Sequence, residues 1–199
     1  KIFKAGSLDD EDAAGGPVAA LQHLVEGQEA YFVKKLLLYP HGGSGNHGCE
    51  AIVRSTLKAM SETGPSACET ILSSSRPDED AKFGLDRLCR IILQNRPIAR
   101  FSAGYVGAAI RKHFFRDGDA YDKLSYHEFF DLAGRDSVAL SIGGDNYCYG
   151  KPRHLYFLNR CLRAKGTRTV LWGASIEPEA MDSEMVKDLS GYDLIFARE

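Results

Sequence analysis

The sequence predicts an α/β protein built on a mainly parallel, doubly wound sheet. From Lys34 onward, short apolar runs alternate with segments of helical periodicity, which is the pattern of successive βαβ units. The apolar runs are rich in Leu, Ile and Val, as expected of strands that helices cover on both faces. Strands are expected near residues 35–39, 69–73, 137–142, 169–172 and 194–197. Residues 34–199 are therefore expected to form one Rossmann-like unit.

Helices are expected between these strands. The segment after the first strand repeats apolar residues at helical spacing. A second helix begins at Pro152, a residue that suits a first helical turn. A third is expected to open at Pro178 and to bury Met181, Met185 and Leu189. Residues 101–115 and 121–133 are also expected to be helical.

Residues 1–33 differ from the rest of the chain. An acidic, glycine-rich stretch, Leu8–Pro17, precedes a short pattern of apolar residues at helical spacing. We interpret residues 1–33 as an N-terminal arm or appendage, and its role stays open.

Composition excludes several classes of function. The 199 residues carry a formal charge of −2, so the chain has no overall basic character for binding nucleic acid. Apolar runs such as Leu36–Tyr39 are far shorter than the roughly 20 residues that span a bilayer. The first residues lack the pattern of a secretory signal, so a cytoplasmic protein is expected. The five cysteines are scattered without a CxxC pair, which favours reduced thiols.

The loops that follow the strands hold most of the chemically versatile residues. In open parallel sheets, ligands bind beyond the carboxyl ends of the strands. The loop after the first strand is His41–Gly48, and Gly143–Tyr147 and Gly173–Pro178 follow the third and fourth strands. The last strand leads into Arg198. Glycine lets a backbone approach a ligand closely, while Asp, Asn, Ser and Arg supply directed hydrogen bonds.

The first loop contains a GxGxxG pattern, Gly43–Gly48, between a strand and a helix. A dinucleotide is disfavoured, because Glu50 falls in the first helical turn, where a pyrophosphate would lie. The second strand also ends in residues 73–76 without the acid that binds a ribose. Two interpretations stay open: a phosphate or carboxylate bound at the loop, or a tight turn with Asn46 as the helix cap.

Other polar residues have competing interpretations. Asp145 can orient a sugar hydroxyl or act as a base, or it can close an Asx turn. His41 and His47 can transfer protons, although a loop histidine is more often exposed or hydrogen-bonded. Tyr147, Tyr149 and Trp172 can stack on a sugar, although core packing is their default. The remaining histidines lack acidic or cysteine partners at ligand spacing, so no metal and no cofactor are expected. The basic residues of segment 100–116 are interpreted as a solvated helix face.

Four stretches resemble the polysaccharide pyruvyl transferases. His41–Ile52 is similar to the glycine-asparagine-glycine-acid-alanine opening of that family. Ser141–Tyr147 resembles its strand plus glycine pair, and Leu171–Pro178 resembles its G-x-S-I-x-P segment. Asp193–Glu199 resembles its D-x-I-x-x-R-[DE] segment. The matches occur in the family's order and span residues 35–199.

The resemblance implies a two-lobed architecture similar to the GT-B glycosyltransferases and transfer of the enolpyruvyl unit of phosphoenolpyruvate onto sugar hydroxyls as a ketal. Residues 34–199 would be the N-terminal lobe, with the C-terminal lobe and most donor-binding residues absent, so this chain alone is expected to be inactive. Asp145 is the candidate catalytic base. The candidate substrate-binding residues are His41, Gly45, Asn46, Asn146, Ser175 and Arg198. The run after Ile142 lacks the family's more usual third glycine, which leaves the acceptor sugar open.

Two competing hypotheses remain. A nucleotide-sugar glycosyltransferase of GT-B type would use the same lobe architecture, since a fold alone does not fix the chemistry. A non-catalytic binding domain is the other alternative, in which residues 1–33 would dock a partner. The oligomeric state is not predicted.

Overall fold

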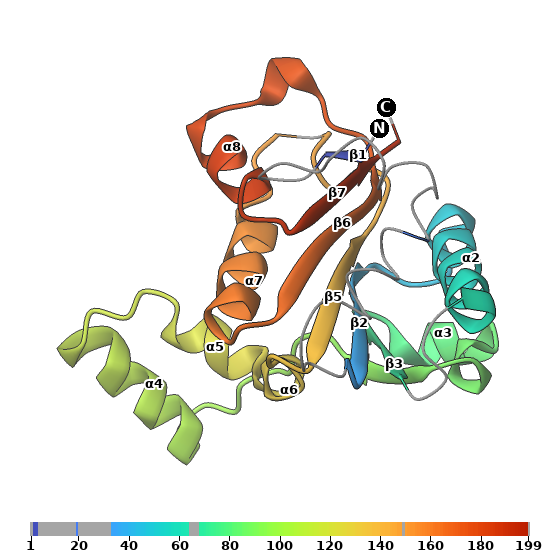
Figure 1. Ribbon diagram of the computed structural model, residues 1–199. Coiled ribbons are helices and arrows are strands. Elements are labelled where there is room, and N and C mark those ends of the chain that lie inside the picture. The colour runs from blue at the N-terminus through green and yellow to red at the C-terminus, as the bar shows by residue number, and fades with distance from the viewer. Residues whose placement is uncertain (1, 4–18, 20–32, 64–67, 149, 199) are drawn as a thin grey trace.

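The computed structural model describes residues 2–3, 19, 33–63, 68–148 and 150–198 (Figure 1). A seven-stranded sheet forms its centre, in the order β1-β7-β6-β5-β2-β3-β4. The strands are β1 (Ile2–Phe3), β2 (Lys35–His41), β3 (Glu69–Ser74), β4 (Arg90–Leu93), β5 (Ser137–Ile142), β6 (Arg168–Ala174) and β7 (Leu194–Ala197). The helices are α2 (His47–Thr63), α3 (Pro77–Lys82), α4 (Ala103–Phe114), α5 (Ala120–Ser125), α6 (His127–Asp131), α7 (Arg153–Ala164) and α8 (Ser183–Leu189), with 3₁₀ turns η2 (Leu85–Arg87) and η3 (Pro178–Ala180).

The sheet is doubly wound. From β2 to β7 every pair of neighbouring strands is parallel, and β1 pairs with β7 antiparallel at one edge. From β2, in the middle of the sheet, the chain moves outward through β3 to β4 at one edge. It then returns through α4, α5 and α6 to β5, on the other side of β2, and moves outward through β6 to β7. The direction of winding therefore reverses between β2 and β5, which is where ligands of such folds bind. The predicted mainly parallel, doubly wound sheet is confirmed.

Helices cover both faces of the sheet. Leu37 and Tyr39 of β2 point into a core that includes residues of α6, α7 and α8. Leu36 and Leu38 point to the opposite face, where Val53 of α2 joins them. This alternation follows from the two-residue period of a strand, and both faces are buried because the crossovers lie on both sides.

The structure differs from the sequence prediction in two places. It adds the strand β4, which was not predicted, and it also contains β1, a two-residue strand within residues 1–33, whose role as an arm or appendage stays a prediction. The helix expected to open at Pro178 is instead a 3₁₀ turn followed by a separate helix, α8. Asp182 starts α8, because its carboxylate accepts a hydrogen bond from the Met185 N–H at 2.9 Å. Met181 therefore precedes the helix and is 43% exposed rather than buried, whereas Met185 and Leu189 of α8 are buried as predicted.

A buried polar network crosses the face of the sheet covered by α7 and α8. Asn159 of α7 donates its side-chain N–H groups to Asp188 Oδ2 and Tyr192 Oη, both at 2.7 Å. Its amide oxygen accepts from the Tyr39 hydroxyl at 2.7 Å. The Tyr147 hydroxyl donates to Asp188 Oδ2, also at 2.7 Å. The network joins β2, the loop after β5, α7 and α8, so it fixes that loop to the core.

The tyrosines of this network make alkaline stability a test of the fold. Burial raises the pKa of Tyr192 to about 12 and the pKa of Tyr39 well above its usual value. In the unfolded chain both ionise near pH 10. Above about pH 10 the unfolded state loses protons that the folded state keeps. The contribution of these tyrosines to the free energy of unfolding is therefore complete below about pH 10 and is lost as the pH rises through about 12.

Urea denaturation at a series of alkaline pH values measures this fall. The thiols also titrate there, since burial raises the pKa of Cys89 to about 11. A matched Tyr192→Phe variant isolates the tyrosine, because it should lower stability near neutrality but fall less steeply above about pH 10. An identical slope in the two proteins would contradict the prediction.

Candidate active site

The candidate site lies at the carboxyl edge of the sheet, around the point where the winding reverses. Asn46, Asp145, Ser175 and Arg198 follow β2, β5, β6 and β7, and these four parallel strands are neighbours in that order. The four residues therefore share one edge of the sheet, as their positions in the sequence predict.

The loop after β2 is held by carboxylates of α3. Ser44 donates its N–H at 2.8 Å and its hydroxyl at 2.6 Å to Asp80 Oδ1. The same oxygen lies 3.0 Å from His41 Nε2. The Gly45 N–H donates to Glu79 Oε1 at 2.5 Å. Two amides of the glycine-rich loop are thus already occupied by the protein's own acids, and His41, 2% exposed, lies beneath the surface of the site.

The glycines of this loop make room for α3. A Cβ at Gly45 would lie 2.7 Å from Glu79 Oε1, and one at Gly43, where φ is +111°, would lie 2.8 Å from it. A pyrophosphate at these amides would meet the Glu79 carboxylate, which adds to the case against a dinucleotide. Asn46 caps α2, since its Oδ1 accepts from the Gly48 N–H at 3.0 Å. The tight-turn interpretation of the GxGxxG pattern therefore describes the local structure.

In the loop after β5, Asn146 holds the backbone and Asp145 is exposed. The Asn146 side chain donates to the Ile142 carbonyl at 3.1 Å and to Ser141 Oγ at 3.3 Å. A Cβ at Gly143, where φ is +137°, would clash with Asn146 Oδ1 at 2.6 Å. Among the residues that the structure describes, no hydrogen bond engages the Asp145 side chain. The Asx-turn interpretation of Asp145 thus finds no support in this geometry.

The loops after β2 and β5 lie close enough for the charge of Asp145 to act on Cys49. Burial raises the pKa of the Cys49 thiol, in the first turn of α2, and the negative charge of Asp145 raises it further. Asp145 therefore lies within electrostatic reach of the start of α2. The Asp145 carboxylate is exposed to solvent and forms no ion pair with the described residues. This edge of the sheet therefore carries an uncompensated negative charge.

A cation lies at the neighbouring strand ends. Arg198 Nη2 donates to Ser175 Oγ at 3.1 Å. The Ser175 N–H in turn donates to the Gly144 carbonyl at 2.7 Å, which ties the loop after β6 to the loop after β5. A Cβ placed on Gly144 would lie 3.5 Å from Arg198 Nη1, which is an ordinary contact distance, so the guanidinium lies next to the loop that carries Asp145.

This arrangement suits a hydroxylated, anionic ligand. A carboxylate can accept a hydroxyl proton, and a guanidinium can bind phosphate or carboxylate oxygens in its plane. Within the described ranges, no group of three or more His, Cys, Asp or Glu side chains could hold a metal ion. The aromatic candidates belong to the core: Tyr147 is fully buried, and Trp172 donates its indole N–H to Thr56 Oγ1 at 3.0 Å. Tyr149 lies outside the described residues.

Sequence reasoning missed the acids that hold the first loop. Glu79 and Asp80 were not among the candidates, although they follow β3 directly in the run Ser75-Arg76-Pro77-Asp78-Glu79-Asp80. Their place after a parallel strand was the available signal, because it puts them at the same edge as the other loops. The binding roles of His41, Gly45, Asn46, Asn146, Ser175 and Arg198 stay predictions.

Comparison with known proteins identifies the family of the chain. No curated protein and no solved structure matches the chain. The family model of the polysaccharide pyruvyl transferases matches residues 46–199, which is most of the chain and includes Asn46, the loops after β5 and β6, and Arg198. The chain therefore belongs to the polysaccharide pyruvyl transferase family.

Proposed function

We propose that residues 34–199 form the N-terminal lobe of an enzyme that transfers a pyruvyl group from phosphoenolpyruvate to a sugar of a polysaccharide or its precursor. The family match supports transfer of a pyruvyl group to a glycan. The observation that carries the proposal is an exposed carboxylate, Asp145, and an exposed guanidinium, Arg198, on the same carboxyl edge of the sheet, with Arg198 next to Gly144 of the loop that carries Asp145.

The chemistry assigns a role to each group. Protonation of the enol methylene makes the neighbouring carbon electrophilic, and a sugar hydroxyl attacks it as its own proton passes to a base. A second hydroxyl then displaces phosphate and closes the ketal. We assign the base to Asp145 and the binding of donor oxygens to Arg198, with Ser175 and Asn146 orienting the two loops.

The other groups of the reaction belong to a second lobe in this proposal. A GT-B-like pairing of two Rossmann-like lobes would close over the carboxyl edge, and the second lobe would supply the proton donor and most of the phosphate contacts. His41 and Gly45 would act through the shape of the first loop, because the structure buries one and bonds the other to Glu79. We place the enzyme in the cytoplasm, where phosphoenolpyruvate is available.

Product release tests the proposal. The full-length protein is incubated with an acceptor glycan and either phosphoenolpyruvate or a set of nucleotide sugars, and released phosphate and nucleotides are measured. We expect phosphate release that depends on phosphoenolpyruvate and a new carboxylate-bearing ketal on the glycan. Release of a nucleotide alone would contradict the proposal and indicate a glycosyltransferase, and release of neither with any acceptor would favour a binding domain.

A further inference from the structure

The helix α4 projects away from the sheet (Figure 1). It packs against α5, with Ala108 buried between them and the Tyr105 and Tyr121 rings 5.4 Å apart. This arrangement leaves most of the circumference of α4 without a partner among the described residues. α4 is therefore available for contacts that the sheet and its covering helices do not supply.

The face of α4 turned away from α5 is apolar. Val106, Ile110 and Phe114 follow one another at four-residue spacing and so form a continuous row along the helix. All three are exposed, and Phe114 is 82% exposed. Phe101 and Phe115, at the two ends of the helix, are 86% and 76% exposed. We call these five residues the α4 apolar face, and large exposed apolar patches of this kind mark interaction sites.

The same segment carries positive charge without negative charge. No Asp or Glu occurs from residue 87 to residue 116, although the whole chain has a formal charge of −2. The cations of this stretch are Arg87, Arg90, Arg96, Arg100, Arg111, Lys112 and Arg116. Four of them flank or belong to α4. The sequence-based interpretation of this segment as a solvated face explains the charges but not the exposed phenylalanines among them.

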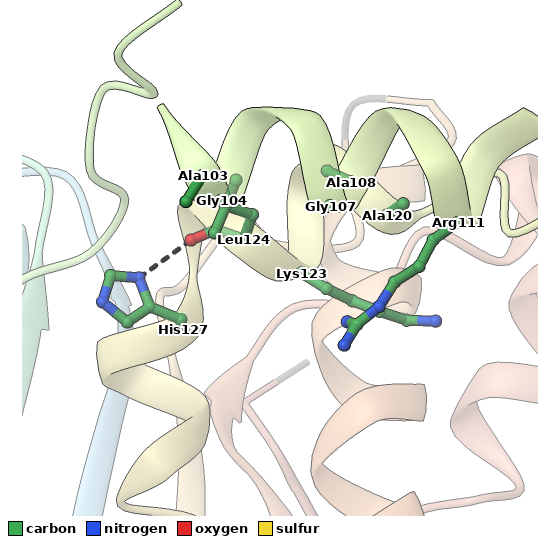
Figure 2. A pocket seen from close by; sticks show the side chains of 9 residues that line it. All are labelled: Ala103, Gly104, Gly107, Ala108, Arg111, Ala120, Lys123, Leu124 and His127. Carbon is green, nitrogen blue, oxygen red and sulfur yellow. Dashed lines mark hydrogen bonds between the residues drawn. The ribbon is translucent and has the colours of Figure 1, made fainter. Parts of the chain in front are cut away.

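A pocket beside the apolar face adds a place for an anionic group. It lies between α4 and α5 and has a volume of about 350 Å³. Small residues of α4 form its wall, and Arg111 of α4 and Lys123 of α5 extend into it (Figure 2). Lys123 binds Asp117 at 2.9 Å and lowers the pKa of that carboxyl, to which the charge of Arg111 also contributes. Two cations thus share one acid.

The backbone at both ends of α4 keeps the aromatic residues exposed. Phe101 has φ of +64° and Arg116 has φ of +53°, in the left-handed region that residues with side chains seldom adopt. The Phe101 ring contacts the Tyr105 ring at 6.1 Å and is otherwise open to solvent. Strained conformations of this kind cluster at functional sites. Burial within the described chain does not account for the conformation of Phe101.

We propose that the α4 apolar face docks on a membrane surface rich in anionic phospholipids. The phenylalanines would enter the boundary between headgroups and acyl chains, and Arg100 and Arg116, which flank α4, would bind lipid phosphates. A second copy of the chain is a poorer occupant, because an α4-to-α4 contact would bring together two segments that carry positive charge and no negative charge. A basic amphipathic helix and a negatively charged lipid surface are complementary in both charge and polarity.

Vesicle flotation with the full-length protein tests the proposal. The probes are vesicles of phosphatidylcholine alone and of phosphatidylcholine with phosphatidylglycerol. We expect binding to the anionic vesicles that weakens with salt, and little binding to phosphatidylcholine alone. The double variant Phe114→Ser/Phe115→Ser should bind at least about tenfold more weakly.

Two exposed apolar residues elsewhere provide the matched control. Met181→Ser/Val186→Ser removes two apolar side chains outside α4 that are 43% and 48% exposed, and it should leave vesicle binding unchanged. Circular dichroism verifies that each variant is folded. The proposal is overturned if the unaltered protein does not bind anionic vesicles, or if both double variants bind them as strongly as the unaltered protein does. It is also overturned if light scattering shows a dimer that Phe114→Ser/Phe115→Ser dissociates while no vesicle binding is found.

Discussion

Replacing Asp188 with alanine is expected to lower the free energy of unfolding by about 3–5 kcal/mol, the usual cost of leaving buried partners of a charge unpaired. Asp188 is 4% exposed and accepts hydrogen bonds from Asn159, Tyr147 and Arg163. The Arg163 guanidinium, 2.8 Å away at Nη2, would lose its counter-ion in a half-buried place. Several donors would lose their acceptor at once, so the effect should exceed that of a single lost hydrogen bond.

Two companion variants separate the loss of the buried charge from the loss of any carboxylate on α8. Asp188→Asn keeps an acceptor oxygen but removes the charge, and it should therefore destabilise less than alanine. Glu184→Ala removes an exposed carboxylate from the same helix and should change the free energy of unfolding by no more than about 0.5 kcal/mol. Urea denaturation followed by circular dichroism measures all three. A loss below about 1 kcal/mol for Asp188→Ala would mean that the network is not a determinant of stability.

The network also connects stability to the site. Tyr147 follows Asn146 directly, and its hydroxyl is bound to Asp188 and lies 2.9 Å from that of Tyr192. The loop that carries Asp145 is therefore fixed at one end by a buried side chain and at the other by the Asn146 contacts with Ile142. An exposed residue on a loop fixed at both ends is held in place without being buried, which suits a group that must meet a substrate.

The sheet was predictable because its strands carry their own signal. Five strands were recognised as apolar runs, since both faces of a parallel sheet exclude water and select Leu, Ile and Val. β4 was missed although Ile91, Ile92 and Leu93 form an apolar run, because it lies between the short α3 and η2 segments and a long stretch without strands, where no alternation of strands and helices indicates it. The glycine-rich turn and its Asn46 cap were predictable as well, because capping depends on residues next to one another in the chain.

Contacts between distant residues set the limit of prediction. Asp80 and Ser44 are 36 positions apart, and no local pattern shows that one holds the other. His41 was accordingly expected at the open edge, whereas the Asp80 carboxylate keeps it inside. The isolation of α4 is a similar case: periodicity indicates a helix over residues 101–115, but which face packs depends on what the rest of the chain brings to it.

Replacing Asp145 with asparagine is expected to lower the rate of pyruvyl transfer by the full-length enzyme by about 100-fold or more, the scale of a positioned general base. Asparagine is nearly the same size as aspartate, but it cannot take a proton from a sugar hydroxyl. The fold should be unaffected, because Asp145 is exposed and its side chain forms no hydrogen bond with the described residues. The expected signature is lost turnover at an unchanged melting temperature.

The measurement needs a control that changes charge without touching the site. Asp136→Asn removes a partly exposed carboxylate next to Lys35, at the start of β2 and so at the opposite end of the sheet from Asp145, and it should leave turnover within about twofold. Rates of phosphate release and melting temperatures are compared for the two variants and the unaltered enzyme. Near-normal turnover of Asp145→Asn would remove Asp145 from the catalytic groups. In that case the base would have to come from another residue at the carboxyl edge or from the second lobe, because the ketal cannot form unless each attacking hydroxyl gives up its proton.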